Sequence, residues 1–215
     1  MFFCLSVLVS DIILVAKGGG FVDSGKCDIE KYAIENNVPI MHKDGILFLV
    51  DIIKKHHVRN ILELGSGIGY SAIQMAQVTP GIKITTIEKD NERYMQAIEN
   101  INAFNLTSQI ECINIDAYDY DTDQRYDMIF LDAAKAQYQG LFDKFINNLT
   151  VNGFMIVDNL LFHGLVDNPE RTHNRRTKDL IRKIKDFREG ILTNSLYDVS
   201  YYPNIGDGVA LVRCR

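Results

Sequence analysis

The stretch NILELGSGIGYS, residues 60–71, leads from a short apolar strand into a glycine-rich turn and the start of a helix. Its Gly-x-Gly-x-Gly pattern permits a sharp turn and close approach of a ligand, because glycine has no Cβ. The next expected strand, residues 83–88, ends in Glu88. An acid at that place can hydrogen-bond the hydroxyls of a ribose. Together, the turn and the acid predict a site for a nucleotide-like cofactor rather than a purely structural turn.

Strand and helix patterns alternate on both sides of this stretch, which is typical of a doubly wound, mostly parallel α/β sheet. Strands are expected at residues 60–64, 83–88, 110–114, 127–132 and 153–158, and helices at 28–37, 44–57, 69–78, 91–104, 137–148 and 174–188. Two later β-rich runs, 197–202 and 208–213, predict an antiparallel C-terminal strand pair. With 215 residues and no internal repeat, one domain is expected at 28–215, after an atypical N-terminal segment, 1–27.

The N-terminal run MFFCLSVLVSDIILVA, residues 1–16, is apolar but does not have the pattern of a signal peptide. No Lys or Arg precedes it, Asp11 interrupts it, and it is short for a membrane span. We therefore expect it to pack on the core or on a partner subunit, with no role in a membrane. The four scattered cysteines form no Cys-x-x-Cys pair, which favours reduced thiols in the cytoplasm over zinc or disulfides.

Two apolar strands end abruptly in acids. Residues 128–131 lead into Asp132, and residues 154–157 lead into Asp158 and Asn159. The carboxyl ends of neighbouring parallel strands open into the crevice where such sheets bind ligands. Two carboxylates and an amide are hard oxygen ligands, so the pattern predicts a site for a divalent cation such as Mg²⁺. The alternative is that each acid only caps the segment that follows it.

The glycine turn also separates two cofactors. It departs from the Gly-x-Gly-x-x-Gly pattern that seats a dinucleotide pyrophosphate on a helix N-terminus. Glu63, just before the turn, would repel a pyrophosphate but can help to hold an ammonium group, directly or through water. These features favour S-adenosylmethionine, which has no phosphate. An NAD-dependent oxidoreductase is the alternative from another class.

Five motifs follow one another along the chain in an order and spacing that indicate a family: ELGSGIGYS (63–71), IEKD (87–90), Asp116-Ala117, LDAAKAQY (131–138) and VDN (157–159). The chain, over about residues 28–215, thereby resembles the cation-dependent O-methyltransferases, the family of the catechol and caffeoyl-coenzyme A enzymes. The segment 32–41 and the ending Gly206-Asp207-Gly208 resemble its bacterial branch, which includes the tRNA 5-hydroxyuridine methyltransferase. Residues 1–22 do not resemble the family's usual N-terminal helix.

The resemblance implies a Rossmann-like class I S-adenosylmethionine-dependent methyltransferase fold, a homodimer, and a role for each motif. The implied cofactor-binding residues are Met41, Glu63, Gly65, Gly67, Ser71, Glu88, Asp116, Ala117 and Asp132; the implied Mg²⁺ ligands are Asp132, Asp158 and Asn159; and the implied catalytic residues are Asp132 and Lys135, the latter as general base. Lys135 could instead be solvated or paired with an acid. We expect Tyr138 to pack rather than to line a pocket, and we interpret the histidines as ordinary surface or loop residues, His42 with least support.

A basic segment, residues 171–188, carries eight Lys or Arg and two Asp, a local charge of +6 in a chain of net charge −5. Because it follows Asp158 and Asn159, we expect it to border the mouth of the site. Basic side chains there suit a phosphate backbone, so Arg175, Arg176, Lys178 and Arg182 are predicted to bind a tRNA anticodon loop. The leading hypothesis is methylation of wobble 5-hydroxyuridine to 5-methoxyuridine. The alternatives for the function are a small catechol-like acceptor, or an RNA-binding module without catalysis. The alternative for the basic segment is a solvated helix face without a binding role.

Overall fold

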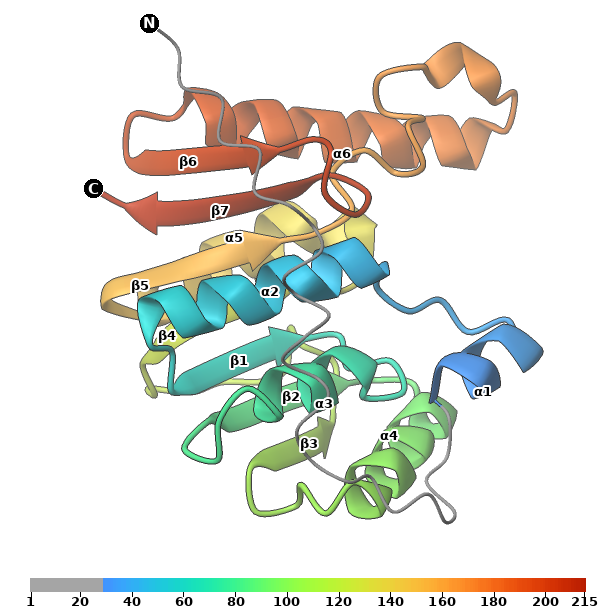
Figure 1. Ribbon diagram of the computed structural model, residues 1–215. Helices are drawn as coiled ribbons and strands as arrows, with labels where there is room; N and C mark the ends of the chain where they lie inside the picture. Colours follow the sequence, from blue (N-terminus) through green and yellow to red (C-terminus); the bar gives the residue numbers. More distant parts are fainter. Residues whose placement is uncertain (1–28) are drawn as a thin grey trace, which may run out of the picture.

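A computed structural model describes residues 29–215 (Figure 1). The expectations for segment 1–27, including its packing role, lie outside the described residues. The helices are α1 (Ile29–Glu35), α2 (Lys43–His56), α3 (Tyr70–Ala76), α4 (Asn91–Ala103), α5 (Tyr138–Phe145) and α6 (Arg175–Thr193), with short 3₁₀ helices η3 (Lys135–Gln137), η4 (Ile146–Asn148) and η5 (Pro169–Arg171). The strands are β1 (Asn60–Leu64), β2 (Lys83–Glu88), β3 (Ile110–Asn114), β4 (Tyr126–Leu131), β5 (Leu149–Val157), β6 (Tyr197–Tyr202) and β7 (Val209–Cys214).

The strands form one sheet in the order β3-β2-β1-β4-β5-β7-β6. The first five strands in this order run parallel, and β7 is antiparallel to both β5 and β6. The predicted doubly wound sheet with an antiparallel C-terminal pair is therefore confirmed. Most bounds agree with the sequence expectation to within about three residues, and two differ by more. Strand β5 begins at Leu149, where it pairs with Tyr126 across a register shift, and α6 continues to Thr193 because Ile191 extends its buried face.

Both faces of the sheet are covered, which explains why its strands read as continuous apolar runs. Ile61 and Met128 lie on the face covered by α2 and α3, whereas Leu62 and Ile129 lie on the face covered by α5 and α6. Figure 1 shows α2 and α3 in front of the sheet and α5 behind it. Successive strand residues point to opposite faces, so the two layers of the core share the same strands.

The three central strands end level with one another. In the parallel register Leu64 pairs with Leu131, and Leu131 pairs with Val157. The ladder continues one step further, because the Asp132 amide donates to the Leu64 carbonyl at 3.1 Å and the Asp158 amide donates to the Leu131 carbonyl at 3.3 Å. The residues that follow these strands are thus fixed side by side at one edge of the sheet.

Helix α6 is amphipathic and begins at a capping residue. The Asn174 side chain accepts a hydrogen bond from the Thr177 amide at 3.1 Å, which satisfies a free donor of the first turn. Its inward face buries Ile181, Ile184, Phe187 and Ile191. The Phe187 ring meets Tyr138 and Phe142 edge to face, with centroids 5.7 and 5.5 Å apart. No helix within residues 29–215 has the length and apolar character needed to cross a membrane.

We predict that Phe187→Ala lowers the free energy of unfolding by about 3–5 kcal/mol, because it leaves a cavity among packed aromatic rings. For a chain of this size the midpoint of thermal unfolding should fall by roughly 10 °C. Leu192→Ala, at an exposed position on the same helix, is the matched control and should change the midpoint little. Equal midpoints for the two variants in calorimetry would contradict this account of the core.

Candidate active site

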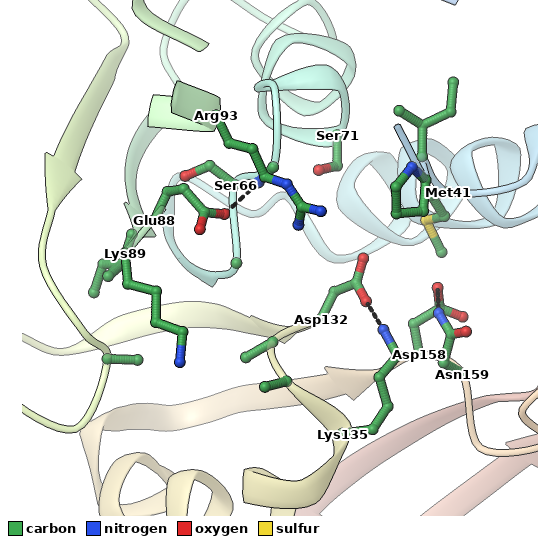
Figure 2. A pocket seen from close by; sticks show the side chains of 18 of the residues that line it. Met41, Ser66, Ser71, Glu88, Lys89, Arg93, Asp132, Lys135, Asp158 and Asn159 are labelled. Atoms are coloured by element: carbon green, nitrogen blue, oxygen red, sulfur yellow. Dashed lines mark hydrogen bonds and ion pairs between the residues drawn. The ribbon is translucent and has the colours of Figure 1, made fainter. Parts of the chain in front are cut away.

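A cavity of about 470 Å³ opens at the carboxyl edge of the sheet. It is bounded by the loops that follow β1, β2, β4 and β5 and by the segment 39–42 before α2. Figure 2 shows two groups of side chains around it. Glu88, Lys89 and Arg93 lie on one side, and Asp132, Lys135 and the acid-amide pair 158–159 lie on the other. The glycine loop and Ser71 lie between the two groups.

The glycine turn lies directly against the backbone that follows β4. Gly65 has φ +104°, and a Cβ there would lie 2.4 Å from the carbonyl oxygen of Asp132. Only glycine fits this approach, both for its backbone angle and for the space. The Gly67 amide donates to Glu88 Oε2 at 2.9 Å, so the turn is also tied to the end of β2.

The acid that ends β2 is held rigidly. Glu88 is 8% exposed, and its other oxygen, Oε1, accepts the Asp90 amide at 2.9 Å. Further along this side of the cavity, Asp116 accepts the Tyr118 amide at 3.0 Å, and Lys89 lies 3.4 Å away. The backbone hydrogen bond and Lys89 lower the pKa of Asp116. The cofactor-binding residues predicted from the sequence that line the cavity are Met41, Gly65, Gly67, Ser71, Glu88, Asp116, Ala117 and Asp132.

Glu63 departs from its predicted place at the cofactor. It is fully buried and is not among the residues that line the cavity. Its two oxygens accept hydrogen bonds from the hydroxyls of Ser71 and Thr86. Burial raises the pKa of Glu63 to about 7, against the effect of these hydrogen bonds. Glu63 therefore contacts the cavity through Ser71, which does line it, and its charge acts at longer range on Asp132 and Glu88.

The acids after β4 and β5 meet on the other side of the cavity (Figure 2). Asp158 is 2% exposed, and its Oδ2 accepts the Asn159 amide group at 3.0 Å. Its Oδ1 is buried and has no hydrogen-bond partner among residues 29–215. Burial and the nearby Asp132 raise the pKa of Asp158 to about 7, and burial raises the pKa of Asp132 in spite of Lys135. Lys135 reaches Asp132 Oδ1 at 3.0 Å and is the cation paired with these acids.

This donor set fits a divalent cation. The Asp132 carboxylate, whose side chain is 22% exposed, pairs with the Lys135 ammonium group. Oδ1 of the buried Asp158 has no partner among residues 29–215 and is an acceptor of the kind that a cation satisfies. Within residues 29–215 no group of three or more His, Cys, Asp or Glu side chains is placed to bind a metal ion. The set is thus two carboxylates and the Asn159 amide, which suits Mg²⁺ because that ion usually keeps several waters.

Tyr138 packs, as we expected from the sequence. It is 1% exposed, its ring contacts Phe187, and its hydroxyl donates to the Asp158 carbonyl at 3.0 Å. The Tyr138 hydroxyl group thus helps to fix the backbone of Asp158 by a hydrogen bond. Burial and the neighbouring acids raise the pKa of Tyr138 well above its usual value, so it serves as a neutral donor.

Several lining residues were not predicted. Phe162 and His163 follow the acid pair, their ring centroids lie 5.6 Å apart, and both border the cavity, as does His42. His163 is a loop residue, as expected, but it also lines the cavity. Arg93 also lines the cavity from the first turn of α4. The sequence could have indicated Arg93, because the helix that follows Glu88 begins at the same edge of the sheet and Arg93 lies in its first turn.

The basic segment does not border the cavity, contrary to expectation. Arg175, Arg176, Lys178 and Arg182 are exposed on α6, and none of them is among the lining residues. The reason is that α6 turns its apolar side inward, so its cations face solvent. The start of this region still lies near the site, because α6 packs against η3, which carries Lys135.

The strand order, with antiparallel β7 inserted beside β5, and the glycine turn with its acid at the end of β2 define a class I S-adenosylmethionine-dependent methyltransferase. More narrowly, the chain belongs to the O-methyltransferase family, whose model matches residues 27–215. The resemblance noted in the sequence is thereby confirmed at the level of the family, and the enzyme is a S-adenosylmethionine-dependent O-methyltransferase.

Individual relatives agree with this assignment. The caffeoyl-CoA O-methyltransferase of Populus kitakamiensis is 26% identical over 193 residues, covering 86% of this chain and 81% of the relative. The catechol O-methyltransferase of Niastella koreensis is 28% identical over 175 residues, covering 76% and 77%. A Staphylococcus aureus crystal structure assigned as a caffeoyl-CoA O-methyltransferase superposes with TM-score 0.85 at 30% identity, covering 96% of this chain and 98% of that one.

Glu63 gives this site a testable pH dependence. A carboxyl whose pKa rises from about 4.3 in the unfolded chain to about 7 in the native state binds its proton more tightly when folded. Its contribution therefore lowers the free energy of unfolding as the pH rises from about 5 to 8, by on the order of 3 kcal/mol. We predict that Glu63→Gln removes this decline.

Urea unfolding of both proteins at pH 5, 6, 7 and 8, with EDTA present, measures the effect. The variant should gain stability relative to the wild type as the pH rises. Parallel stability curves would show that the Glu63 carboxyl keeps its ordinary pKa and would contradict the prediction.

Proposed function

We propose that this enzyme transfers the methyl group of S-adenosylmethionine to one hydroxyl of an acceptor that carries two adjacent oxygens, with Mg²⁺ as cofactor. One observation carries the proposal: the backbone of Asp132 lies against the glycine turn, and the neighbouring Asp158 has a buried Oδ1 without a hydrogen-bond partner among residues 29–215. A cation held by Asp132, Asp158 and Asn159 would therefore be next to the cofactor. Two adjacent acceptor oxygens can bind such a cation together, which fixes the direction of the reacting hydroxyl.

The chemistry divides between the bound groups and the chain. S-adenosylmethionine supplies a methyl carbon on a positive sulfur, and Mg²⁺ supplies a Lewis acid that lowers the pKa of the acceptor hydroxyl. Glu88 and the glycine turn hold the cofactor, and Asp132 joins the cofactor side of the cavity to the acceptor side. Lys135 is the candidate group for taking the hydroxyl proton, which it could do only in its neutral amine form, because it lines the cavity with its Nζ 3.0 Å from Asp132.

A small catechol-like acceptor is the first candidate. Met41, Phe162 and His163 give the cavity apolar and aromatic walls near the acid pair, which suit a flat ring. A catechol carries the adjacent oxygens that the proposed cation requires. The relatives named after catechol and caffeoyl-CoA support the same class of acceptor.

Wobble 5-hydroxyuridine in tRNA is the second candidate. Its 5-hydroxyl and O4 form a similar oxygen pair, and a single-stranded loop can splay such a base into a pocket. The exposed cations of α6 favour it, because that helix packs on the 3₁₀ turn that carries Lys135.

For the cation, we predict that Asp158→Asn lowers methyl transfer to a catechol acceptor at least ~100-fold, because the amide removes one charged ligand. The affinity for S-adenosylhomocysteine in calorimetry should stay within ~3-fold, because the cofactor residues are unchanged. EDTA should abolish wild-type transfer, and Mg²⁺ should restore it. Asp186→Asn, an exposed acid on α6, is the control. Full wild-type turnover in EDTA would contradict the metal assignment.

For the acceptor, we predict that the triple charge reversal Arg175→Glu, Arg176→Glu, Lys178→Glu leaves kcat/KM for a catechol within ~2-fold. If tRNA is the acceptor, the same variant should weaken tRNA binding and flatten its salt dependence, since fewer counterions are released. Purified enzyme is assayed with a catechol and with tRNA containing 5-hydroxyuridine, and nucleosides are identified by mass spectrometry. Unchanged 5-methoxyuridine-type nucleosides in cells that lack the gene would remove the tRNA candidate.

A further inference from the structure

The loop that follows the acid pair has an unusual backbone. Asn159, Phe162 and His163 all have positive φ, at 61°, 46° and 56°. This left-handed region is disfavoured for residues with a Cβ, and such conformations persist only where the surroundings determine them. One of these residues is a proposed cation ligand and the other two border the cavity. Whatever holds the loop therefore also sets the shape of the site.

The turn between β6 and β7, residues 203–208, is what holds it. The Leu160 amide donates to the Gly208 carbonyl at 2.9 Å, and the Leu161 amide donates to the Asp207 carbonyl at 2.8 Å. The His163 amide donates to both carboxylate oxygens of Asp207, at 2.8 and 2.6 Å. Three amides of the loop thus end on two consecutive residues of one turn.

The turn is itself fitted closely to its surroundings. The Gly206 amide donates to Asp44 Oδ2 at 2.9 Å, which ties the turn to the first turn of α2. Gly208 has φ +82°, and a Cβ there would lie 2.8 Å from Leu161 Cγ. A Cβ on Gly206 would lie 3.5 Å from Asp158 Oδ1. The turn therefore reaches the acid pair as well as the loop.

We propose that Asp207 is a positioning residue, which fixes loop 159–163 so that Asn159 stays beside Asp158 and the rings of Phe162 and His163 stay at the cavity. Asp207 acts mainly on the backbone of the loop, because both of its oxygens accept the His163 amide, at 2.8 and 2.6 Å. Its Oδ2 also lies 3.6 Å from Nδ1 of the exposed His163 ring, and the Asp207 side chain is 10% exposed. The inference rests on the proposed function in one respect, the role of Asp158 and Asn159 as cation ligands.

The alternative is that Asp207 acts through its negative charge near Asp132 and Asp158. Two substitutions separate the two roles. Asp207→Asn removes the charge but keeps an oxygen that can accept the His163 amide, whereas Asp207→Ala removes both. Positioning predicts that Asn preserves what Ala loses, and a charge effect predicts that both variants lose it equally.

The first measurement is amide hydrogen exchange of the metal-free full chain, followed by mass spectrometry of peptides that contain residues 159–164. Asp207→Ala should speed exchange there at least ~10-fold, Asp207→Asn should stay within ~3-fold of the wild type, and exchange in β1 and β4 should not change. Asp198→Ala, an exposed acid on β6, is the matched control. Unchanged exchange in the Ala variant would overturn the proposal, and so would equal acceleration in Ala and Asn.

The second measurement is Mn²⁺ affinity, because loss of a group that orients a metal ligand typically weakens metal binding 10–100-fold. Asp207→Ala should weaken Mn²⁺ binding by ~10-fold or more, while the affinity for S-adenosylhomocysteine stays within ~2-fold. Equal losses of both affinities would indicate general destabilisation and would overturn the proposal. If Asp207→Ala does not fold, Asp44→Ala replaces it, and faster exchange at 159–164 is again expected.

The two proposals fail separately. A wild-type protein that does not bind Mn²⁺ would refute the metal assignment in the proposed function, whereas the exchange measurement still decides what Asp207 holds. A wild-type protein that binds Mn²⁺, with an Ala variant that binds it equally well, would refute the positioning role alone.

Discussion

The site depends on the level ending of three parallel strands. The ladder that pairs Leu64 with Leu131 and Leu131 with Val157 places the next residue of each strand at one edge. Those residues are Gly65, at the cofactor turn, and the two acids. Because Gly65 has no Cβ, the turn lies against the backbone of Asp132, and methyl donor and acceptor can share one small cavity. A shift of one residue in either strand pair would break this arrangement, since alternate residues face opposite sides of the sheet.

This arrangement concentrates negative charge where water is largely excluded. Lys135 compensates part of it, and burial raises the pKa of both Asp132 and Asp158. A charged acceptor that is buried without a partner is unfavourable. A positive charge bound at this edge of the sheet would therefore be stabilised. The proposed cation and the sulfonium group of S-adenosylmethionine would both supply positive charge there, so their binding would also stabilise the fold.

The sequence predicted those features that depend on local order. Strand ends located Glu88, Asp132, Asp158 and Asn159, because an apolar run that stops at an acid shows where the sheet edge lies. Glu63 was predicted to help hold an ammonium group, directly or through water, and the alternation along β1 instead places it on the side of Ile61, outside the cavity lining and hydrogen-bonded to Ser71. The α6 cations, the loop 159–163 and its contact with Asp207 depend on tertiary packing and on left-handed backbone angles, which residue patterns did not reveal.

The insertion of β7 between β5 and β6 also affects the order in which parts of the site can form during synthesis of the chain. The turn that holds loop 159–163 lies later in the chain than any other part of the site. During synthesis, the glycine turn and Glu88 leave the ribosome well before residues 206–208. Loop 159–163 lacks the hydrogen-bond partners that hold it until those later residues have emerged. The side of the cavity that carries the acid pair is therefore completed only when almost the whole chain has been made.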